Sequence, residues 1–283
     1  MKPVAFDYER PTTLADAAML LGQANGFSKV LAGGQSLGPM LNLRLAQPDL
    51  LVDITSIAEL TAINETADHL EIGACITHAN IEDGRVPDHF AGLMQRVAGR
   101  IAYRAVRNRG TIGGSLAHAD PAADWLSALS LLGAEAVVST PQGSRSVAVG
   151  ELALSSFTTV LKPHELIRAV RVPKLSAGSR WGFYKFSQKA GEFAHAIGGV
   201  LHDPARGRFR AVIGAIETAP IVIADATSLF GGAFGPGIAD RLDQPAVLKL
   251  LDGKNVTDEY IRSLALVALK RAANQASNQA SAS

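Results

Sequence analysis

Apolar and polar residues follow two different periods at the start of the chain. Residues 12–25 (TTLADAAMLLGQAN) combine a threonine suited to cap a helix with apolar residues at helical spacing, and Gly26 ends the run. The short apolar run KVLAGG at 29–34 predicts a strand, residues 39–48 have mixed helical character, and LLVDIT at 50–55 predicts a second, buried strand. This order is typical of a βαβ unit.

The middle of the chain contains two stretches with the pattern of β-hairpins. Residues 60–75 alternate around a polar tip at 65–68, and residues 134–150 place two apolar runs on either side of the turn PQG. A further strand is predicted at 164–173 (HELIRAVRVP). These runs predict a second sheet.

Two helices are predicted between these strands. Thr77 has the side chain of a helix cap. In DPAADWLSALSLLG, Asp120 stands at a cap position, Pro121 at the first helical position and Gly133 at the end. We therefore expect a helix from about Pro121 to Gly133.

The last third of the chain predicts an antiparallel sheet followed by a helix. A boundary is expected at 175–179, where LSAGS is small and polar, and Thr257 is predicted to cap the helix that follows the strands. The tail at 276–283 (ASNQASAS) is expected to be frayed. The predicted strands are WGFYKFSQK at 181–189, FAHAIGGVL at 193–201 and GRFRAVIGAI at 207–216.

Composition removes several classes of function. The chain has 283 residues, of which 47% are hydrophobic, so it can bury a large core. Its 27 Lys and Arg nearly balance its 26 Asp and Glu, so we expect no binding to nucleic acid or to an anionic membrane. The start of the chain lacks a signal-peptide pattern and no window is long and apolar enough for a membrane span, so we expect a cytoplasmic protein.

The cysteine and histidine residues of this sequence do not predict a metal site. The one cysteine, Cys75, cannot form an internal disulfide or supply the thiolates of an iron–sulfur cluster. The seven histidines show no short metal-binding spacing. We assign no metal, and any iron–sulfur cluster must be on another chain.

Two glycine segments carry the strongest chemical signal. VLAGGQSLGP at 30–39 and GTIGGSLAH at 110–118 both place a Gly-Gly pair and a serine at a turn. Glycine allows backbone N–H groups to converge on an anion, and a serine hydroxyl adds a donor. Two such segments could hold a diphosphate from two sides.

The same glycine pairs could also serve the fold alone. Gly-Gly pairs are common in tight turns between packed elements, which is the alternative for either segment taken by itself. Neither segment matches the G-x-G-x-x-G fingerprint of nicotinamide-binding domains, the nucleoside triphosphate loop or the G-x-S-x-G turn of hydrolases.

The segments AGGQSLGPMLNLRLAQPDLLVDI at 32–54 and VRNRGTIGGSLAHADPAADW at 106–125 resemble the flavin-binding medium subunit of molybdenum hydroxylases. This family includes the carbon monoxide dehydrogenase flavoprotein and the flavin domain of xanthine dehydrogenase. The resemblance extends over essentially the whole chain.

The resemblance implies a set of FAD-binding residues. The two glycine segments would hold the FAD diphosphate, Ile101 and Ala102 would lie close to the flavin, Asp124 would face the cofactor site, and Lys185 would reach the flavin ring. A first-turn helix carboxylate is the alternative for Asp124, and a solvated strand residue is the alternative for Lys185. Phe193 stands where some relatives have a tyrosine near the ring, so the stacking partner is left open. The implied set is Ala32, Gly33, Gly34, Gln35, Ser36, Leu37, Ile101, Ala102, Thr111, Gly114, Ser115, Asp124 and Lys185, with Leu161 and Ile167 as weaker apolar candidates.

The predicted fold class is α+β. The resemblance implies an FAD-binding domain of the vanillyl-alcohol-oxidase-like type at 1–176, with α/β subdomains at about 1–55 and 56–176. A C-terminal domain at 177–283, with an antiparallel sheet and helices, would follow.

The resemblance also implies an electron-transfer function. A large subunit with a molybdopterin cofactor would hydroxylate the substrate, a small subunit would carry electrons through two [2Fe–2S] clusters, and FAD on this chain would pass them to an external acceptor. The assembly would be a heterotrimer or a dimer of heterotrimers. The organic substrate and the acceptor are left open.

Two other classes of function are carried as alternatives. The first is a stand-alone FAD-dependent oxidoreductase of the vanillyl-alcohol-oxidase type, and the second is a non-catalytic assembly subunit in which the glycines serve packing only.

Overall fold

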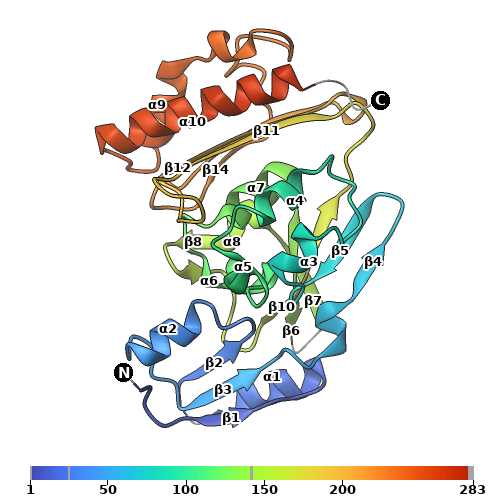
Figure 1. Cartoon of the computed structure of the whole chain (residues 1–283), viewed down its shortest axis with the longest axis vertical. Coiled ribbons are helices and arrows are strands. Elements are labelled where there is room, and N and C mark those ends of the chain that lie inside the picture. Colours follow the sequence, from blue (N-terminus) through green and yellow to red (C-terminus); the bar gives the residue numbers. More distant parts are fainter. Residues whose placement is uncertain (1, 25, 141–142, 280–283) are drawn as a thin grey trace.

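The computed structural model describes residues 2–24, 26–140 and 143–279. Three sheet-based parts are stacked along the long axis of the molecule, in the order of the chain (Figure 1). The predicted α+β class is confirmed by this arrangement of helices and sheets.

The first part is a three-stranded sheet of order β1-β3-β2 in which both pairings are parallel. The predicted βαβ unit is present, and the side chain of Thr13 accepts a hydrogen bond from the amide of Asp16 at the start of the first helix. The sequence pattern missed β1, because its residues are exposed and carry no apolar signal. The elements are β1 (Asp7–Glu9), α1 (Leu14–Gln23), β2 (Ser28–Leu31), α2 (Leu37–Asn42) and β3 (Leu50–Asp53).

The second part is a five-stranded antiparallel sheet of order β4-β5-β10-β6-β7, accompanied by short helices. Both predicted hairpins are confirmed, although part of the turn of the second one, at 141–142, lies outside the described residues. The strands are β4 (Ile63–Glu65), β5 (His69–Gly73), β6 (Glu135–Thr140), β7 (Gly143–Ala148) and β10 (Leu166–Pro173), with a small separate sheet of β8 (Ala153–Ser155) and β9 (Thr158–Thr159).

Helix α7 (Asp124–Leu132) begins later than the sequence predicted. The side chain of Asp120 accepts a hydrogen bond from the amide of Ala122, and its carbonyl accepts one from Ala123, so residues 120–123 form a turn. Ala123 then has extended backbone angles, and the helix starts after it. The other helices of this part are η1 (Ala58–Thr61), α3 (His78–Glu82), α4 (Leu93–Ala98), α5 (Arg104–Arg107), α6 (Ile112–His118) and α8 (Val149–Leu152).

The third part is a four-stranded antiparallel sheet of order β11-β12-β13-β14, held between α7 and the long helix α10. A Cβ atom on Gly182 would lie 1.9 Å from the carbonyl oxygen of Ala272, so the backbones of the sheet and of α10 are in direct contact. The predicted strands are confirmed. The elements are β11 (Arg180–Phe186), β12 (Ala196–Asp203), η2 (Pro204–Arg206), β13 (Arg208–Gly214), β14 (Ile221–Ile223), η3 (Ile238–Arg241), α9 (Gln244–Asp252) and α10 (Glu259–Asn278).

Both ends of α10 differ from the sequence prediction. The cap is Asp258 rather than Thr257, because the Asp258 carboxylate accepts hydrogen bonds from the amides of Tyr260 and Ile261. The helix also continues through residues expected to be frayed, since Ala276 is buried and the side chain of Gln279 accepts a hydrogen bond from the Trp181 amide. Residues 280–283 lie outside the described residues.

A continuous apolar core joins the second part to the sheet of the third. Trp125 on α7 is completely buried, and the same cluster reaches Phe183 and Ile197 of the third sheet. Because one buried cluster contains residues of all three parts, the loops between their elements are held in fixed positions relative to one another. Among the helices in the described ranges, none has the length and apolar character needed to cross a bilayer.

Candidate cofactor site

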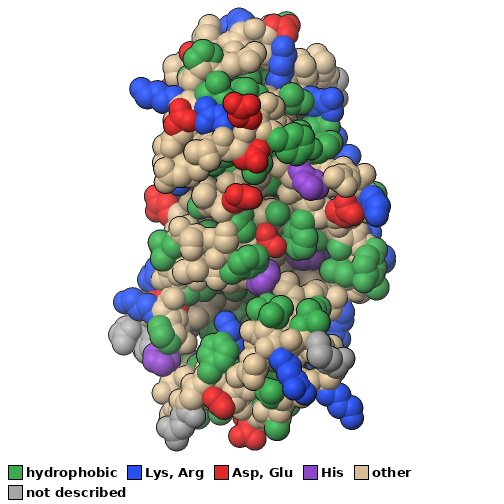
Figure 2. Space-filling view, turned by 90° about the vertical axis from the view of Figure 1, so that its left-hand side faces the viewer, with side chains coloured by type: hydrophobic (Ala, Val, Ile, Leu, Met, Phe, Trp, Pro, Cys, Tyr) green, Lys and Arg blue, Asp and Glu red, His purple; other side chains and the backbone are tan. Residues whose placement is uncertain are grey.

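The two glycine segments lie side by side. A Cβ atom on Gly33 would stand 2.0 Å from the carbonyl oxygen of Arg109 and 2.8 Å from the Cα of Gly110. On the other side of the contact, a Cβ on Gly114 would lie 3.8 Å from the Cβ of Ala32. A side chain at Gly33 is therefore sterically excluded. The molecular surface is hollowed between the first and second parts on the side of the molecule that carries α2 and α6 (Figure 2).

The first glycine segment presents free backbone donors. Strand β2 ends at Leu31, Gly34 has φ +71°, and its carbonyl accepts a hydrogen bond from the Gly38 amide, which starts α2. Within the described ranges, no group accepts a hydrogen bond from the backbone N–H groups of residues 33–37. The hydroxyl of Ser36 also has no partner there. These donors are available to an anion.

The second glycine segment is built differently from the prediction. It is the start of helix α6, and Thr111 caps the helix by accepting a hydrogen bond from the Gly114 amide at 3.0 Å. The amides of residues 112, 113 and 115 donate to carbonyls of Ile76, Ala74 and Thr111. The expectation of a second nest of free amides at residues 112–115 is therefore wrong, because these amides hold the segment in the fold. Close backbone approach and the hydroxyl of Ser115 are what this segment offers to a ligand.

Asp124 and Lys185 form a buried ion pair. Lys185 Nζ lies 2.8 Å from Asp124 Oδ2, and each side chain is only 5% exposed. Burial raises the pKa of the Asp124 carboxyl above its ordinary value, whereas the Lys185 ammonium acts in the opposite direction. The pair joins the first residue of α7 to strand β11. The alternative of a solvated strand lysine is wrong, because the Lys185 side chain is buried. Asp124 does stand in the first turn of α7, as its alternative states, and it is also the buried partner of Lys185.

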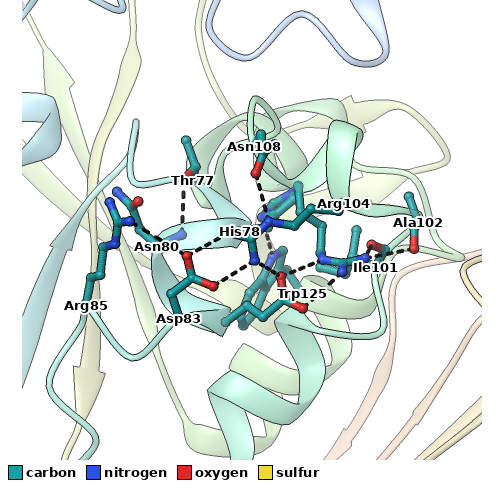
Figure 3. A network of polar contacts seen from close by, with 12 residues as sticks. Thr77, His78, Asn80, Asp83, Arg85, Ile101, Ala102, Arg104, Asn108 and Trp125 are labelled. Atoms are coloured by element: carbon teal, nitrogen blue, oxygen red, sulfur yellow. Dashed lines mark hydrogen bonds and ion pairs between the residues drawn. The ribbon is translucent and has the colours of Figure 1, made fainter.

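Ile101 and Ala102 form a turn held by a network of polar side chains (Figure 3). Ala102 has φ +44°, an unusual value for a residue with a side chain. Its carbonyl oxygen lies 2.6 Å from the position of a Cβ on Gly191, in the loop between β11 and β12. Phe193, in the same loop, is 60% exposed. The Ile101–Ala102 turn thus contacts the loop between β11 and β12, which carries the exposed Phe193.

The two weaker candidates lie apart from these loops. Ile167 is buried in the main core on β10, and Leu161 is a partly buried residue packed against that core. Strand β10 contacts α6, so Ile167 acts behind the second glycine segment rather than at a surface.

His78 is a residue that the sequence reasoning missed. Trp125 Nε1 donates a hydrogen bond to His78 Nδ1 at 3.1 Å, and a Cβ on Gly110 would lie 2.9 Å from the His78 ring. Burial lowers the pKa of His78 to about 4, so the ring is neutral and can accept this bond. His78 therefore supports Gly110, and through it the second glycine segment, from behind. Its place after the helix cap Thr77 was the only signal in the sequence.

The residues present fit a ligand with an anionic end. An anion beside α2 would meet the amides of residues 33–37 and the hydroxyls of Ser36 and Ser115. Lys185, on strand β11, supplies a buried cation. In the described part of the chain, no group of three or more His, Cys, Asp or Glu side chains is arranged to hold a metal ion.

Comparisons with known proteins give a consistent result. A family model described as the FAD binding domain in molybdopterin dehydrogenase matches residues 4–175. The medium chain of carbon monoxide dehydrogenase from Afipia carboxidovorans is 32% identical over 295 aligned residues, which cover 99% of this chain and 99% of that protein. Subunit alpha of the 6-hydroxypseudooxynicotine dehydrogenase complex from Paenarthrobacter nicotinovorans is 40% identical over 199 residues, covering 70% of this chain and 67% of that subunit. A chain in the solved structure of carbon monoxide dehydrogenase from Hydrogenophaga pseudoflava matches with a TM-score of 0.86 and 32% identity, covering 98% of each chain.

The buried ion pair gives a first prediction. Asp124→Leu leaves the Lys185 ammonium buried without a partner and should lower the free energy of unfolding by about 3–5 kcal/mol. The double variant Asp124→Leu, Lys185→Met should regain most of this loss. Urea unfolding followed by circular dichroism measures both. Lys189→Met, in the exposed pair with Glu192, is the control and should change stability by less than about 1 kcal/mol. A double variant as unstable as the single one would show that the unpaired charge is not the cause.

His78 gives a second prediction, on pH. Between pH 6.5 and about 4 the unfolded chain binds a proton at His78 and the folded chain does not, so stability should fall as the pH is lowered through this window. The contribution is on the order of 3 kcal/mol. His78→Gln keeps an acceptor for Trp125 and should remove this part of the pH dependence, while the exposed His164→Gln should not. Urea unfolding at several pH values tests this, and equal slopes for the wild type and His78→Gln would contradict it.

Proposed function

Because this chain belongs to the family of FAD binding domains in molybdopterin dehydrogenases, we propose that it is the FAD-carrying electron-transfer subunit of a molybdenum hydroxylase complex. It would accept electrons from [2Fe–2S] clusters on a partner subunit and pass them to an external acceptor. The family is one of oxidoreductases, and the relatives named above are dehydrogenase subunits.

The row of free amides at residues 33–37, directly beside α6, is the observation that carries this proposal. A diphosphate needs several donors from a backbone that it can approach closely, and glycines at 33 and 34 provide both. We propose that Ala32, Gly33, Gly34, Gln35, Ser36 and Leu37 hold it on one side, and that Thr111, Gly114 and Ser115 hold it on the other.

The flavin ring would lie toward the ion pair and the Ile101–Ala102 turn. When bound, FAD exchanges electrons one or two at a time, which suits a carrier between clusters and an acceptor. Lys185 would place a positive charge near the ring, and Asp124 holds that ammonium in position at 2.8 Å. Ile101 and Ala102 would exclude water from the ring, while Ile167, with Leu161 packed against the same core, would support the second glycine segment from behind.

We propose residues 1–176 as the FAD-binding domain, with subdomains at about 1–55 and 56–176, and residues 177–283 as the C-terminal domain. The division is supported by the sheets, since strands β1 to β10 end at Pro173 and β11 begins at Arg180.

The proposed partners are a large subunit with the molybdopterin cofactor and a small subunit with two [2Fe–2S] clusters, in a heterotrimer or a dimer of heterotrimers. Two observations support them. One curated relative is a medium chain and another is a subunit of a complex, and the one cysteine of this chain cannot ligate a cluster. We also propose a cytoplasmic location, where a free thiol such as that of Cys75 stays reduced.

The proposed function is tested by comparing the chain alone with its complex. The tagged chain is purified with its partners, the partners are identified by mass spectrometry, and carbon monoxide, an aldehyde, a purine or an N-heterocycle is added without oxygen. We expect one of these to bleach the visible flavin absorption of the complex and not that of the isolated chain. Bleaching of the isolated chain would favour a stand-alone oxidoreductase, and a colourless complex would favour an assembly subunit.

The phosphate end of the site gives a further prediction. Gly34→Ala should cost about 1–2 kcal/mol in stability because φ is +71°, and it should also raise the dissociation constant of FAD by about tenfold or more, because the loop amides must turn. Gly207→Ala is a matched control. It has φ +60° and open space around its Cβ position, in the turn between β12 and β13, so it should lose similar stability and keep FAD affinity. Fluorescence titration with FAD measures the affinities, and equal affinities in both variants would refute the assignment of residues 33–37.

A further inference from the structure

Arg107 links the turn at residues 101–102 to the end of α3 through its side chain. Its Nε and Nη2 donate to the two carboxylate oxygens of Glu82 at 2.8 and 2.9 Å, and its Nη1 donates to the carbonyls of Ile101 and Ala102, both at 3.0 Å. The side chain is only 12% exposed. One guanidinium therefore fixes the turn at 101–102 to the end of α3.

Arg104, on the same short helix, provides a natural comparison. It also binds Glu82, through Nη1 at 2.7 Å, and it pairs with Asp83, but its side chain is 47% exposed and it reaches neither carbonyl of the turn. Both arginines thus form ion pairs with Glu82, while only Arg107 contacts the turn. If Arg107 is removed, Glu82 keeps Arg104 as its partner, so no charge is left unpaired.

The turn at 101–102 needs an external support. The left-handed backbone of Ala102 is unfavourable for a residue with a Cβ, so neighbouring groups must hold it. The carbonyl of Ala102 that Arg107 binds also lies against Gly191, and Ala194 in the same loop donates to the Ala122 carbonyl at 3.4 Å. The loop therefore rests on the Ile101–Ala102 turn at one point and on the segment before Asp124 at another.

We propose that Arg107 is a positioning residue for the flavin-ring end of the FAD site. This inference rests on the proposed function. By binding both carbonyls, Arg107 holds the Ile101–Ala102 turn, and with it the loop that carries Phe193, in the position that packs against the ring. It does not touch the cofactor itself.

The test compares Arg107→Gln with Arg104→Gln in the full chain. Arg107→Gln should raise the dissociation constant of FAD by about tenfold, equivalent to ~1.4 kcal/mol, and should change the visible circular dichroism of the bound flavin. It should also weaken the binding of oxidised and reduced FAD by unequal factors, because the ring environment changes. Arg104→Gln should keep the wild-type flavin spectrum, the wild-type affinity for FAD and the wild-type ratio of the dissociation constants of oxidised and reduced FAD.

A second variant keeps the test decisive if Arg107→Gln folds poorly. Arg107→Lys retains the charge, but one ammonium cannot serve both Glu82 and the two carbonyls, so it should change the flavin spectrum in the same direction with a smaller loss of affinity. Wild-type spectrum and affinity in Arg107→Lys, or equal changes in the Arg104 and Arg107 variants, would overturn the inference. If the wild-type chain itself bound no FAD, the proposed function would fail instead.

Discussion

The carbonyl oxygen of Arg109 occupies the place where a side chain on residue 33 would have to stand, and this contact sets the geometry of the whole site. Because Gly33 has no Cβ, the end of strand β2 lies directly against the backbone of residues 109 and 110. Ala32, just before the backbone amides of residues 33–37, lies beside Gly114 of α6. A larger residue at 33 would separate the first sheet from the second, and the donors would no longer converge.

The two glycine segments look alike in the sequence but differ in whether their backbone amides are bonded within the protein. The second one uses the amides of residues 112–115 to bind Ile76, Ala74 and Thr111, which makes it a rigid wall. The first one leaves the amides of residues 33–37 without acceptors among the described residues, a state that costs free energy unless water or a ligand satisfies them. A rigid second segment and free amides in the first segment are both needed. If the first segment could move, its amides could turn inward and donate to protein carbonyls, and they would no longer be available to a ligand.

The sequence predicted what depends on local patterns. Hairpins, the βαβ unit and the strands of the third sheet follow from apolar periodicity and turn residues, and the glycine segments follow from their composition. Hydrogen bonds of particular side chains were not predicted from these patterns. The start of α7 depends on a turn closed by Asp120, the end of α10 on the bond between Gln279 and Trp181, and the support of the site on Arg107 and His78. Gln279 and Trp181, and Trp125 and His78, are far apart in the chain, so no local pattern reports their contacts. Asp120 and its turn, and Arg107 and Ala102, are close in the chain, but apolar periodicity does not report bonds of polar side chains to the backbone.

The two ends of the site are therefore under different kinds of constraint. At the proposed phosphate end the backbone amides would be the binding groups, and the fold itself tolerates few changes at Gly33 and Gly34, whatever side chain replaces them. At the proposed ring end the geometry depends on side chains, since Arg107 holds the backbone of the turn and Asp124 holds the ammonium of Lys185. Under the proposed assignment, substitutions there would alter the surroundings of the ring while the diphosphate stays bound. If the proposed assignment holds, the third sheet, which supplies Lys185 and the loop with Phe193, would tune the reactivity of the cofactor independently of the first sheet, which would anchor it.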